Sequence, residues 1–282
     1  MPMKRMSLVW LIRLLLMMSM SLTFSSNVFA GADSKLWPAL KEAFFEKREM
    51  KEVDFIKIDA PTRAESGAQV PITYKVDNFL SNGVVIKKLY VFVDANPIPL
   101  AATYHFTDAL SDTKKQVQFE LSTRIRFETD SYVHLVGESE SGQLFFTSRE
   151  IRASGGCGST DNGDEAAIRA AVGNIKLRVG ELDEPVKLGS PTYVTFNIKH
   201  IMRTGLQRDA ATQGYYPAFY IKKTTFTYNR KPLFSVDVGV GTAEDPYIKF
   251  NFVPDAMGTL AVTAADNEGK IFVSEVEVKG AE

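Results

Sequence analysis

The sequence predicts an all-β protein with two Ig-like antiparallel β-sandwich domains and a short helix before the first. Apolar and polar residues alternate along many short segments, which is the period of a strand with one buried face. Turn-forming residues separate these segments at short intervals, and a glycine-rich stretch near the middle of the chain interrupts them. The 282 residues are enough for two domains of ordinary size.

Residues 1–30 have the pattern of a secretory signal peptide. A basic start that extends to Arg13 precedes an apolar stretch, residues 14–24, which is shorter than the roughly 20 residues that a membrane-spanning helix needs. Ala30 provides a small residue for cleavage, so we expect a mature chain that begins near Gly31 in the periplasm, without a membrane span. An uncleaved membrane anchor is the alternative, because the basic region reaches the apolar stretch.

Residues 31–152 are predicted to form the first domain, which opens with a short helix. Leu36, Leu40 and Phe44 recur at helical spacing, and Pro38 suits the first turn of a helix. Further along, the period changes to two, and alternating segments begin near residues 70, 89, 117, 133 and 144. Several short strands separated by turn residues are typical of an Ig-like antiparallel sandwich.

Residues 153–168 have the composition of a linker and are predicted to carry the functional site. The stretch from Ala153 to Asp164 contains four glycines and no large apolar side chain. Alternation then resumes and continues to Val278, with Asp266 to Gly269 as a predicted hairpin turn. Residues 169–282 are therefore predicted to form the second β-sandwich domain.

Cys157 is the only cysteine of the chain, and it lies between Gly155-Gly156 and Gly158. A lone cysteine cannot form an internal disulfide, so in an oxidising compartment it bonds another molecule, reacts, or stays buried and inert. Glycine neighbours lack side chains that could cover the thiol, so we expect it to be exposed and mobile. We interpret Cys157 as the nucleophile to which cargo is attached, with the three glycines giving a swinging arm its flexibility. An incidental linker cysteine is the alternative interpretation.

Metal, cofactor and nucleic-acid sites are not predicted. His105, His134 and His200 lie far apart in strand-like segments, whereas the ligands of a metal cluster together. Cys157 has no partner in a Cys-x-x-Cys arrangement, so dithiol redox catalysis is not expected. A net charge of −1 and the lack of a long basic run argue against nucleic acid or an anionic membrane surface as the partner.

Four short motifs occur in a fixed order along the chain. Lys88 to Pro97 has the pattern of a central strand that ends in an Asn-Pro turn, and Gly155 to Gly158 reads Gly-Gly-Cys-Gly. In the second half, His200 to Gly205 reads His-Ile-Met-Arg-Thr-Gly, and Asp245 to Tyr247 reads Asp-Pro-Tyr. The first pair resembles SoxY and the second pair resembles SoxZ, the two subunits of the sulfur-carrier complex of bacterial sulfur oxidation.

The resemblance implies a single-chain SoxY–SoxZ fusion that acts as a periplasmic carrier and not as an enzyme. In the family, the SoxY cysteine holds sulfur-compound intermediates, such as thiosulfate-derived groups, as covalent adducts while partner enzymes process them. Cys157 then has this role here, periplasmic sulfur-oxidation enzymes are the partners, and the two halves contact each other within the chain. His200 and the hairpin from Arg203 to Pro217 are expected to serve that contact and not the chemistry.

Two other functions stay open at this point. Single-chain fusions of this kind are typically associated with quinoprotein dehydrogenases. The chain is therefore alternatively a non-catalytic accessory or binding module of a periplasmic quinoprotein (PQQ) dehydrogenase system. A thiol enzyme in its own right is the other alternative. A Cys157-linked disulfide dimer is also expected in oxidised preparations.

The chain departs from the family pattern at three places. The SoxY arm ends freely, whereas here the chain continues into the second half, so the arm is tethered at both ends. With Arg152 as the last fixed residue, Cys157 has a reach of about 17 Å. Ser159 replaces a glycine, and Ile201 replaces the proline that follows the histidine of the third motif. The double tether argues against insertion into pockets shaped for a free tail.

Overall fold

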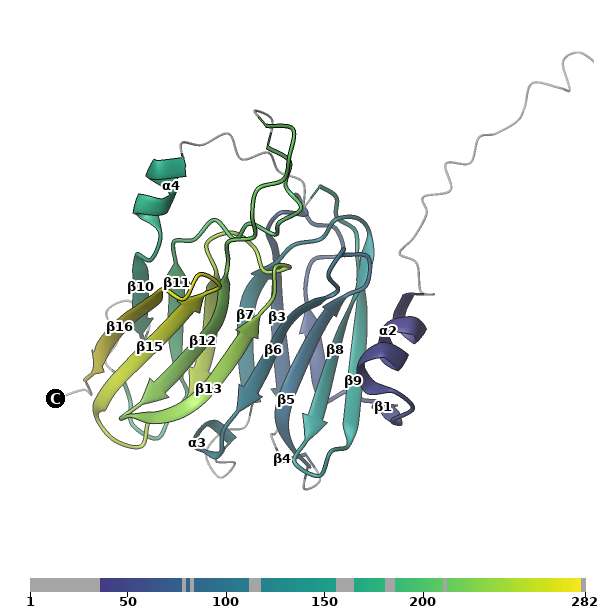
Figure 1. Ribbon diagram of the computed structural model, residues 1–282. Helices are drawn as coiled ribbons and strands as arrows, with labels where there is room; N and C mark the ends of the chain where they lie inside the picture. Colours follow the sequence, from purple (N-terminus) through teal and green to yellow (C-terminus); the bar gives the residue numbers. More distant parts are fainter. Residues whose placement is uncertain are drawn as a thin grey trace, which may run out of the picture. The chain divides into compact units, whose positions relative to one another are not determined.

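A computed structural model describes residues 36–77, 80–81, 84–111, 118–155, 165–180, 186–209 and 212–279, and strands account for 54% of these residues. The helices in these ranges are short, which confirms the predicted all-β fold class (Figure 1). All of the described residues belong to one compact unit, Gly31–Glu282.

The first half of the chain begins with a helix and continues with nine strands among the described residues. These elements are α2 (Leu36–Phe45), β1 (Met50–Glu52), β2 (Ile56–Asp59), β3 (Val70–Asp77), β4 (Leu80–Ser81), β5 (Val84–Val93), β6 (Leu100–Phe106), α3 (Asp108–Ser111), β7 (Gln118–Ile125), β8 (Ser131–Ser139) and β9 (Leu144–Ile151).

The second half begins with helix α4, which the sequence analysis did not predict. Its elements are α4 (Glu165–Ala171), β10 (Ile175–Val179), β11 (Thr192–Ile198), β12 (Ile221–Tyr228), β13 (Lys231–Val238), β14 (Tyr247–Phe252), β15 (Gly258–Asp266) and β16 (Ile271–Val278). The predicted turn from Asp266 to Gly269 joins the last two strands, and Gly269 has the positive φ of 93° that favours glycine.

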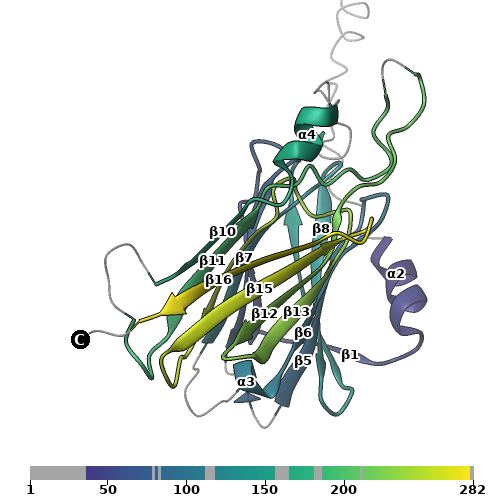
Figure 2. The same ribbon diagram turned by 60° about the vertical axis from the view of Figure 1, so that its left-hand side comes forward.

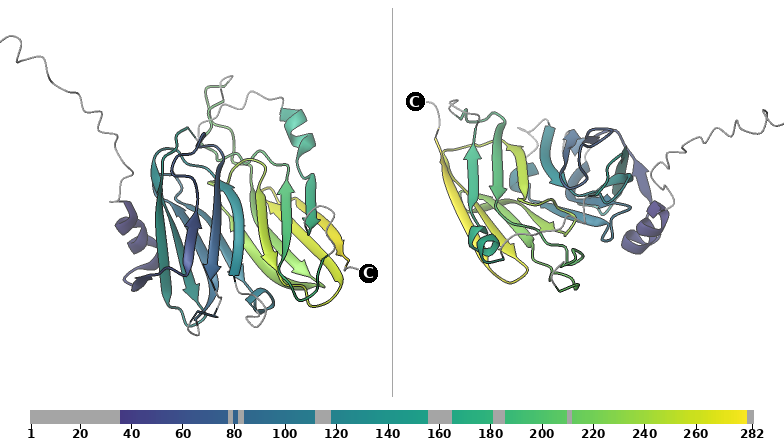
Figure 3. Two further views of the ribbon diagram at one scale, coloured as in Figure 1. Left: turned by 180° about the vertical axis from the view of Figure 1, so that it is seen from behind. Right: turned by 90° about the horizontal axis from the view of Figure 1, so that it is seen from above.

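The described strands form two sheets, and each sheet contains strands of both halves. The first sheet has the order β1-β9-β8-β5-β6-β13-β12-β15-β16, with β4 beside β5, and the second has the order β10-β11-β14-β7-β3-β2. The view from behind in Figure 3 shows the blue strands of the first half beside the green and yellow strands of the second. Among the described strands, only β1 and β9 pair in parallel.

Two strand pairings join the halves. In the first sheet β6 pairs with β13, from Phe106 opposite Phe234 to Ala102 opposite Val238. In the second sheet β7 pairs with β14. The predicted division at residues 153–168 stays a prediction, and the structure adds that the strands on either side of it share both sheets.

The space between the sheets is filled by one core to which both halves contribute, and Phe234 lies in it with 0% exposure. The centroid of its ring is 6.4 Å from that of Phe119 in the first half. It is 4.8 Å from the centroids of Phe226 and Phe250 in the second half. Burial alternates along the strands: in β3, Val70, Ile72, Tyr74 and Val76 are buried and the residues between them are not, which matches the period of two in the sequence. The halves are therefore held together by packing as well as by backbone pairing.

The helix predicted after the signal peptide is present as α2, and it covers part of the outer face of the first sheet. Phe45 of the helix packs with Phe92, Val136 and Leu144 of that sheet. Near the other end of the helix, the indole of Trp37 stacks on a histidine ring of β8, with centroids 3.9 Å apart. The outer face of β5, β8 and β9 is thus apolar where the helix lies on it.

We predict that the two halves unfold together. The Phe234→Ala substitution should lower the free energy of unfolding by about 3–5 kcal/mol, because it opens a cavity in the shared core. Urea unfolding followed by tryptophan fluorescence and by circular dichroism should show one coincident transition at a lower midpoint. The control Lys223→Ala, at an exposed position of β12, should leave the midpoint nearly unchanged. Two separate transitions, of which only one moves, would contradict the prediction.

Candidate functional site

The predicted attachment residue, Cys157, lies outside the described residues, as do Gly156 and Gly158. We call residues 156–164 the cysteine segment. Gly155, the residue before it, is described and has a positive φ of 77°. The structure therefore describes the site through the two points at which the chain is fixed before and after the cysteine segment.

The cysteine segment joins the described chain at one end of the sandwich. It follows β9, whose last residue, Ile151, pairs with Ser131 at the start of β8. It precedes α4 and then β10, whose first residue, Ile175, pairs with Ile198 at the end of β11. Figures 1 and 2 show α4 and the hairpin of residues 203–219 projecting from this same end. Both flanks of the segment thus stand beside the loops that connect the strands there.

The first anchor is a run of backbone hydrogen bonds that continues beyond β9. The Arg152 N–H donates to the Thr62 carbonyl at 2.9 Å, and the Ala64 N–H donates to the Arg152 carbonyl at 2.8 Å. The Ala153 N–H donates to a carboxylate oxygen of Asp130 at 3.0 Å. The chain after the strand is therefore held by the loop that precedes β3.

The anchoring extends as far as Gly155, which corrects the expectation that Arg152 is the last fixed residue. The Gly67 N–H donates to the Ser154 carbonyl at 3.0 Å, and the Gly155 N–H donates to the Glu128 carbonyl at 3.1 Å. Cys157 follows Gly155 by two positions, which limits its reach from this anchor to about 7 Å. The sequence could not show this, because Gly67 and Glu128, the hydrogen-bond partners of Ser154 and Gly155, are distant from them in the chain.

Gly67 makes the first anchor possible. A Cβ atom at this position would lie 2.2 Å from the Phe127 carbonyl oxygen and 2.7 Å from the Ser154 carbonyl oxygen. Both distances are far below van der Waals contact, so a residue with a side chain would push the loop away from the strand end. The same glycine accepts the Phe127 N–H at 2.8 Å. Its lack of a side chain therefore fixes the point at which the cysteine segment starts.

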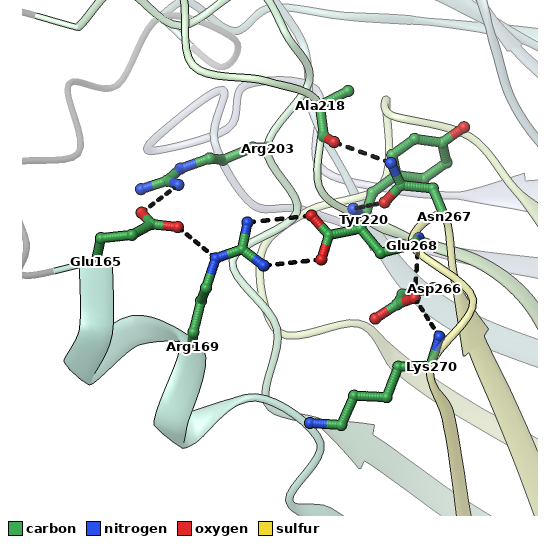
Figure 4. A network of polar contacts seen from close by, with 9 residues as sticks. All are labelled: Glu165, Arg169, Arg203, Ala218, Tyr220, Asp266, Asn267, Glu268 and Lys270. Carbon is green, nitrogen blue, oxygen red and sulfur yellow. Dashed lines mark hydrogen bonds and ion pairs between the residues drawn. The ribbon is translucent and has the colours of Figure 1, made fainter.

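The second anchor is α4, which is held mainly by charged groups (Figure 4). Arg169 donates to both carboxylate oxygens of Glu268, at 2.8 and 3.1 Å, and to Glu165 at 2.7 Å. Arg203 donates to the other oxygen of Glu165 at 2.5 Å. The Arg169 guanidinium also lies 4.5 Å from the ring centroid of Phe219. None of the residues in α4 is buried, so contacts at its surface hold the helix in place.

The turn that carries Glu268 is fixed by its own polar contacts (Figure 4). Asp266 accepts the N–H groups of Glu268 and Lys270 at 3.0 and 2.8 Å. The Asn267 side chain accepts the Tyr220 N–H at 2.8 Å and donates to a carbonyl of the neighbouring loop. The turn therefore holds Glu268 in position independently of Arg169, which lowers the conformational entropy lost when the ion pair forms.

The charges at the second anchor keep both glutamates ionised. Burial raises the pKa of Glu165, but hydrogen bonds from Arg203 and Arg169 outweigh this effect and lower it overall. The hydrogen bond from Arg169 is also the main cause of the lowered pKa of Glu268. Because the two glutamate side chains are 46% and 45% exposed, solvent screens these pairs, and each contributes at most about 1 kcal/mol. The docking of α4 is thus sensitive to salt and to acid.

The third motif of the sequence connects the two halves beside the second anchor. Arg126 of the first half donates to the Met202 carbonyl at 2.6 Å and to the Ile201 carbonyl at 3.4 Å. His200 itself packs against Phe219, with ring centroids 4.4 Å apart. Within this motif, the carbonyls that follow His200 make the contact to the first half, while the histidine packs within the second half.

His200 is fully buried, and this decides its protonation state. Its Nδ1 accepts the Met202 N–H at 3.1 Å, and its Nε2 has no hydrogen-bond partner among the described residues. Burial disfavours the charged imidazolium and lowers the pKa of His200 from 6.5 to about 4. The neutral ring thus supports the turn at residues 200–202.

The three histidines do not meet in the described structure. His105 pairs with Asp237 on the solvent face, and His134 pairs with buried Asp94 at 2.9 Å. The described part of the chain contains no cluster of three or more His, Cys, Asp or Glu residues that could hold a metal ion. It also contains no helix that is long and apolar enough to cross a membrane.

Sequence reasoning named Arg152 as a fixed residue and Arg203 as the start of a hairpin, but it did not find the contacts that form the two anchors. Glu165 and Arg169 are four positions apart, a spacing that favours an ion pair on one helix face, so this pair had a detectable signal. Gly67, Arg203 and Glu268 had no such signal, because their partners are distant in the sequence.

We predict an acid-dependent loss of stability that His200 causes. Because its pKa is lower in the folded protein, the neutral ring stabilises the fold above about pH 6.5. Up to about 3 kcal/mol is lost as the pH falls to about 4. In His200→Asn, whose amide oxygen replaces Nδ1 as the acceptor of the Met202 N–H, this component should be absent. Urea unfolding of both proteins at pH 7, 5.5 and 4 measures the difference. Equal pH dependence in the two proteins would contradict the prediction.

Comparison with known proteins gave two family matches and several structural likenesses. The family model of the sulfur oxidation protein SoxY matches residues 41–157, and that of the sulphur oxidation protein SoxZ matches residues 181–277. A comparison with curated proteins found no match.

Three of the similar solved structures illustrate the likenesses. The sulfur carrier protein SoxY from Chlorobium limicola f thiosulfatophilum is 24% identical over 42% of this chain and 92% of its own, with a TM-score of 0.34. A superoxide reductase (neelaredoxin) from Ignicoccus hospitalis is 21% identical over 42% and 87%, with a TM-score of 0.28. A β-glycosidase from Bacteroides vulgatus is 7% identical over 80% and 25%, with a TM-score of 0.21.

The two family matches agree with the order of the motifs in the sequence. The SoxY match ends on Cys157, and the SoxZ match starts after α4 and includes the motif that begins at His200. Together they cover most of the chain. The chain therefore belongs to the SoxY and SoxZ sulfur-oxidation families, as a single-chain fusion in which a SoxY domain precedes a SoxZ domain.

Proposed function

We propose that this chain is a periplasmic carrier that holds thiosulfate-derived sulfur intermediates covalently on Cys157 and presents them to partner enzymes. The observation that carries the proposal is the SoxY match, which runs up to and includes Cys157 in a chain that also supplies the SoxZ domain. Export by the predicted signal peptide, residues 1–30, would place the carrier in the periplasm.

The loading step needs a thiolate and an oxidant. The thiolate of Cys157 and thiosulfate form a sulfur–sulfur bond, which gives a cysteine S-thiosulfonate and releases two electrons. An electron-accepting redox enzyme, docked on the carrier, takes both electrons. Arg152 is the nearest basic residue in the sequence, five positions from the cysteine, so we infer that the partner's site activates the thiol. The chain itself acts as the carrier and not as the enzyme.

The two anchors set the geometry of presentation. Ten peptide bonds separate Gly155, the end of the first anchor, from Glu165, the start of the second. If α4 leaves its site, the next fixed point is Gly173, whose N–H donates to the Lys199 carbonyl at 2.9 Å. The tether then becomes eight residues longer. We infer that α4 adjusts how far Cys157 can enter a partner's pocket.

The carrier function predicts a reducible adduct on Cys157. Intact-mass analysis of protein isolated from the periplasm should show an added sulfur-containing group that a reductant removes, and Cys157→Ser should lack it. The control Ser159→Ala keeps the thiol within the same segment and should carry the adduct. A non-reducing gel separates this adduct from a disulfide-linked dimer. An unmodified thiol, together with full function of Cys157→Ser, would overturn the proposal and leave the accessory role in a quinoprotein dehydrogenase system.

The tether function predicts that α4 undocks when its charges are removed. In Arg169→Gln, hydrogen–deuterium exchange at the amides of residues 169–171 should become faster, because the contacts to Glu165 and Glu268 are lost. Global stability should change by less than about 1 kcal/mol. High salt should act on the wild type in the same direction. The control Arg178→Gln, at an exposed position of β10, should have no effect on α4. Unchanged exchange in Arg169→Gln would refute the tether function.

A further inference from the structure

Two arginines lie side by side at the first anchor. Arg63 and Arg152 are opposite each other in an isolated parallel bridge. The hydrogen bonds from Arg152 to Thr62 and from Ala64 to Arg152 fix this register. Residues directly opposite in such a pairing project their side chains from the same face. The bridge therefore places two arginine side chains on the same face at the base of the cysteine segment.

These two arginines differ from the arginines of the described chain that form ion pairs. Arg48, Arg169 and Arg203 all form ion pairs with glutamates. Within the described ranges, neither Arg63 nor Arg152 has a carboxylate within ion-pair distance or a side-chain hydrogen bond. Like charges in directly opposite positions repel each other. A bound anion would remove this repulsion, since a guanidinium binds oxyanions with paired N–H groups.

A pocket adjoins Arg63, the arginine that is paired with Arg152 in the bridge. It has a volume of about 690 Å³ and is formed by the loop between β2 and β3. Arg63, Ser66 and Gln69 contribute polar groups to its lining, and Glu65 contributes a carboxylate. The volume is within the range of small-molecule sites and is large enough for an oxyanion. The negative charge of Glu65 repels an anion, so its removal should strengthen anion binding and weaken cation binding.

We propose that Arg63 and Arg152, with Ser66 and Gln69 of the adjoining pocket, bind the oxyanion end of a sulfur compound, a thiosulfate or sulfonate group. The choice of anion rests on the proposed carrier function. The anion has two sources, a free anion from solution and a group carried on Cys157, which follows Arg152 by five positions. Binding here holds the charged end of the cargo at the base of the segment between visits to partner enzymes.

The first experiment uses the full chain with Cys157→Ser, so that no covalent adduct can form. Sodium thiosulfate is titrated at constant ionic strength, and the arginine Nε–Hε signals are followed by NMR. We expect saturable shifts of two arginine signals. Binding should be at least about tenfold weaker in Arg63→Gln/Arg152→Gln, because two charge-assisted contacts are lost. Glu65→Gln should strengthen binding, and Arg178→Gln, an exposed control, should leave it unchanged.

A second experiment distinguishes the two sources. The wild-type thiol is treated with 2-sulfonatoethyl methanethiosulfonate, which forms a disulfide to Cys157 and releases methanesulfinate. A methyl methanethiosulfonate label gives the uncharged control. If the tethered sulfonate prevents free thiosulfate from binding and the methyl label does not, the carried cargo is a source. Free thiosulfate that binds equally to both labelled proteins assigns the site to the free anion.

The site is overturned if thiosulfate does not bind saturably, or if the double arginine variant binds it as tightly as its parent. These outcomes are independent of the carrier function. If Cys157 carries a reducible adduct but the protein does not bind the anion, only the proposed anion site is overturned. If the protein binds the anion but Cys157 carries no adduct, only the proposed covalent carrier function is overturned.

Discussion

Backbone hydrogen bonds between β6 and β13, and between β7 and β14, carry both sheets from the SoxY half into the SoxZ half. The rest of the structure depends on this pairing, because it brings distant loops to one end of the sandwich. The aromatic core around Phe234 then fixes the distance between the sheets. The two halves therefore form one compact unit in which neither presents a free edge at the junction.

This junction gives the cysteine segment two anchors of different physical kind. The first is a set of backbone hydrogen bonds that ends at Gly155 and depends on Gly67 having no side chain. The second consists of ion pairs around Glu165 and Arg169, on a helix with no buried residue. Backbone bonds respond little to salt, whereas exposed ion pairs are screened. The first anchor is thus expected to be insensitive to salt, and the second to weaken as salt is added.

The arginine pair at the base of the segment follows from the same arrangement. Arg152 continues β9, while Arg63 comes from the loop before β3, and the first anchor makes them neighbours. The hydrogen bonds that hold the chain there therefore also pair two positively charged residues, one of which precedes Cys157 by five positions. A carrier of anionic groups gains from such a charge, because an anion at the end of a short tether meets it at high effective concentration.

The sequence by itself determined the fold class, the helix before the strands and the place of the cysteine between the two halves. Alternating residues report which strand faces are buried, and glycine and turn residues report where strands stop. The motifs also indicated both families. Only the tertiary structure decided that the sheets run through both halves, that the anchor extends to Gly155, and that α4 is held by Arg203 and Glu268. Strand order and contacts between distant residues depend on which strand edges pair in space. The periodicity of the sequence reports the buried face of each strand, but it does not specify the partner strand.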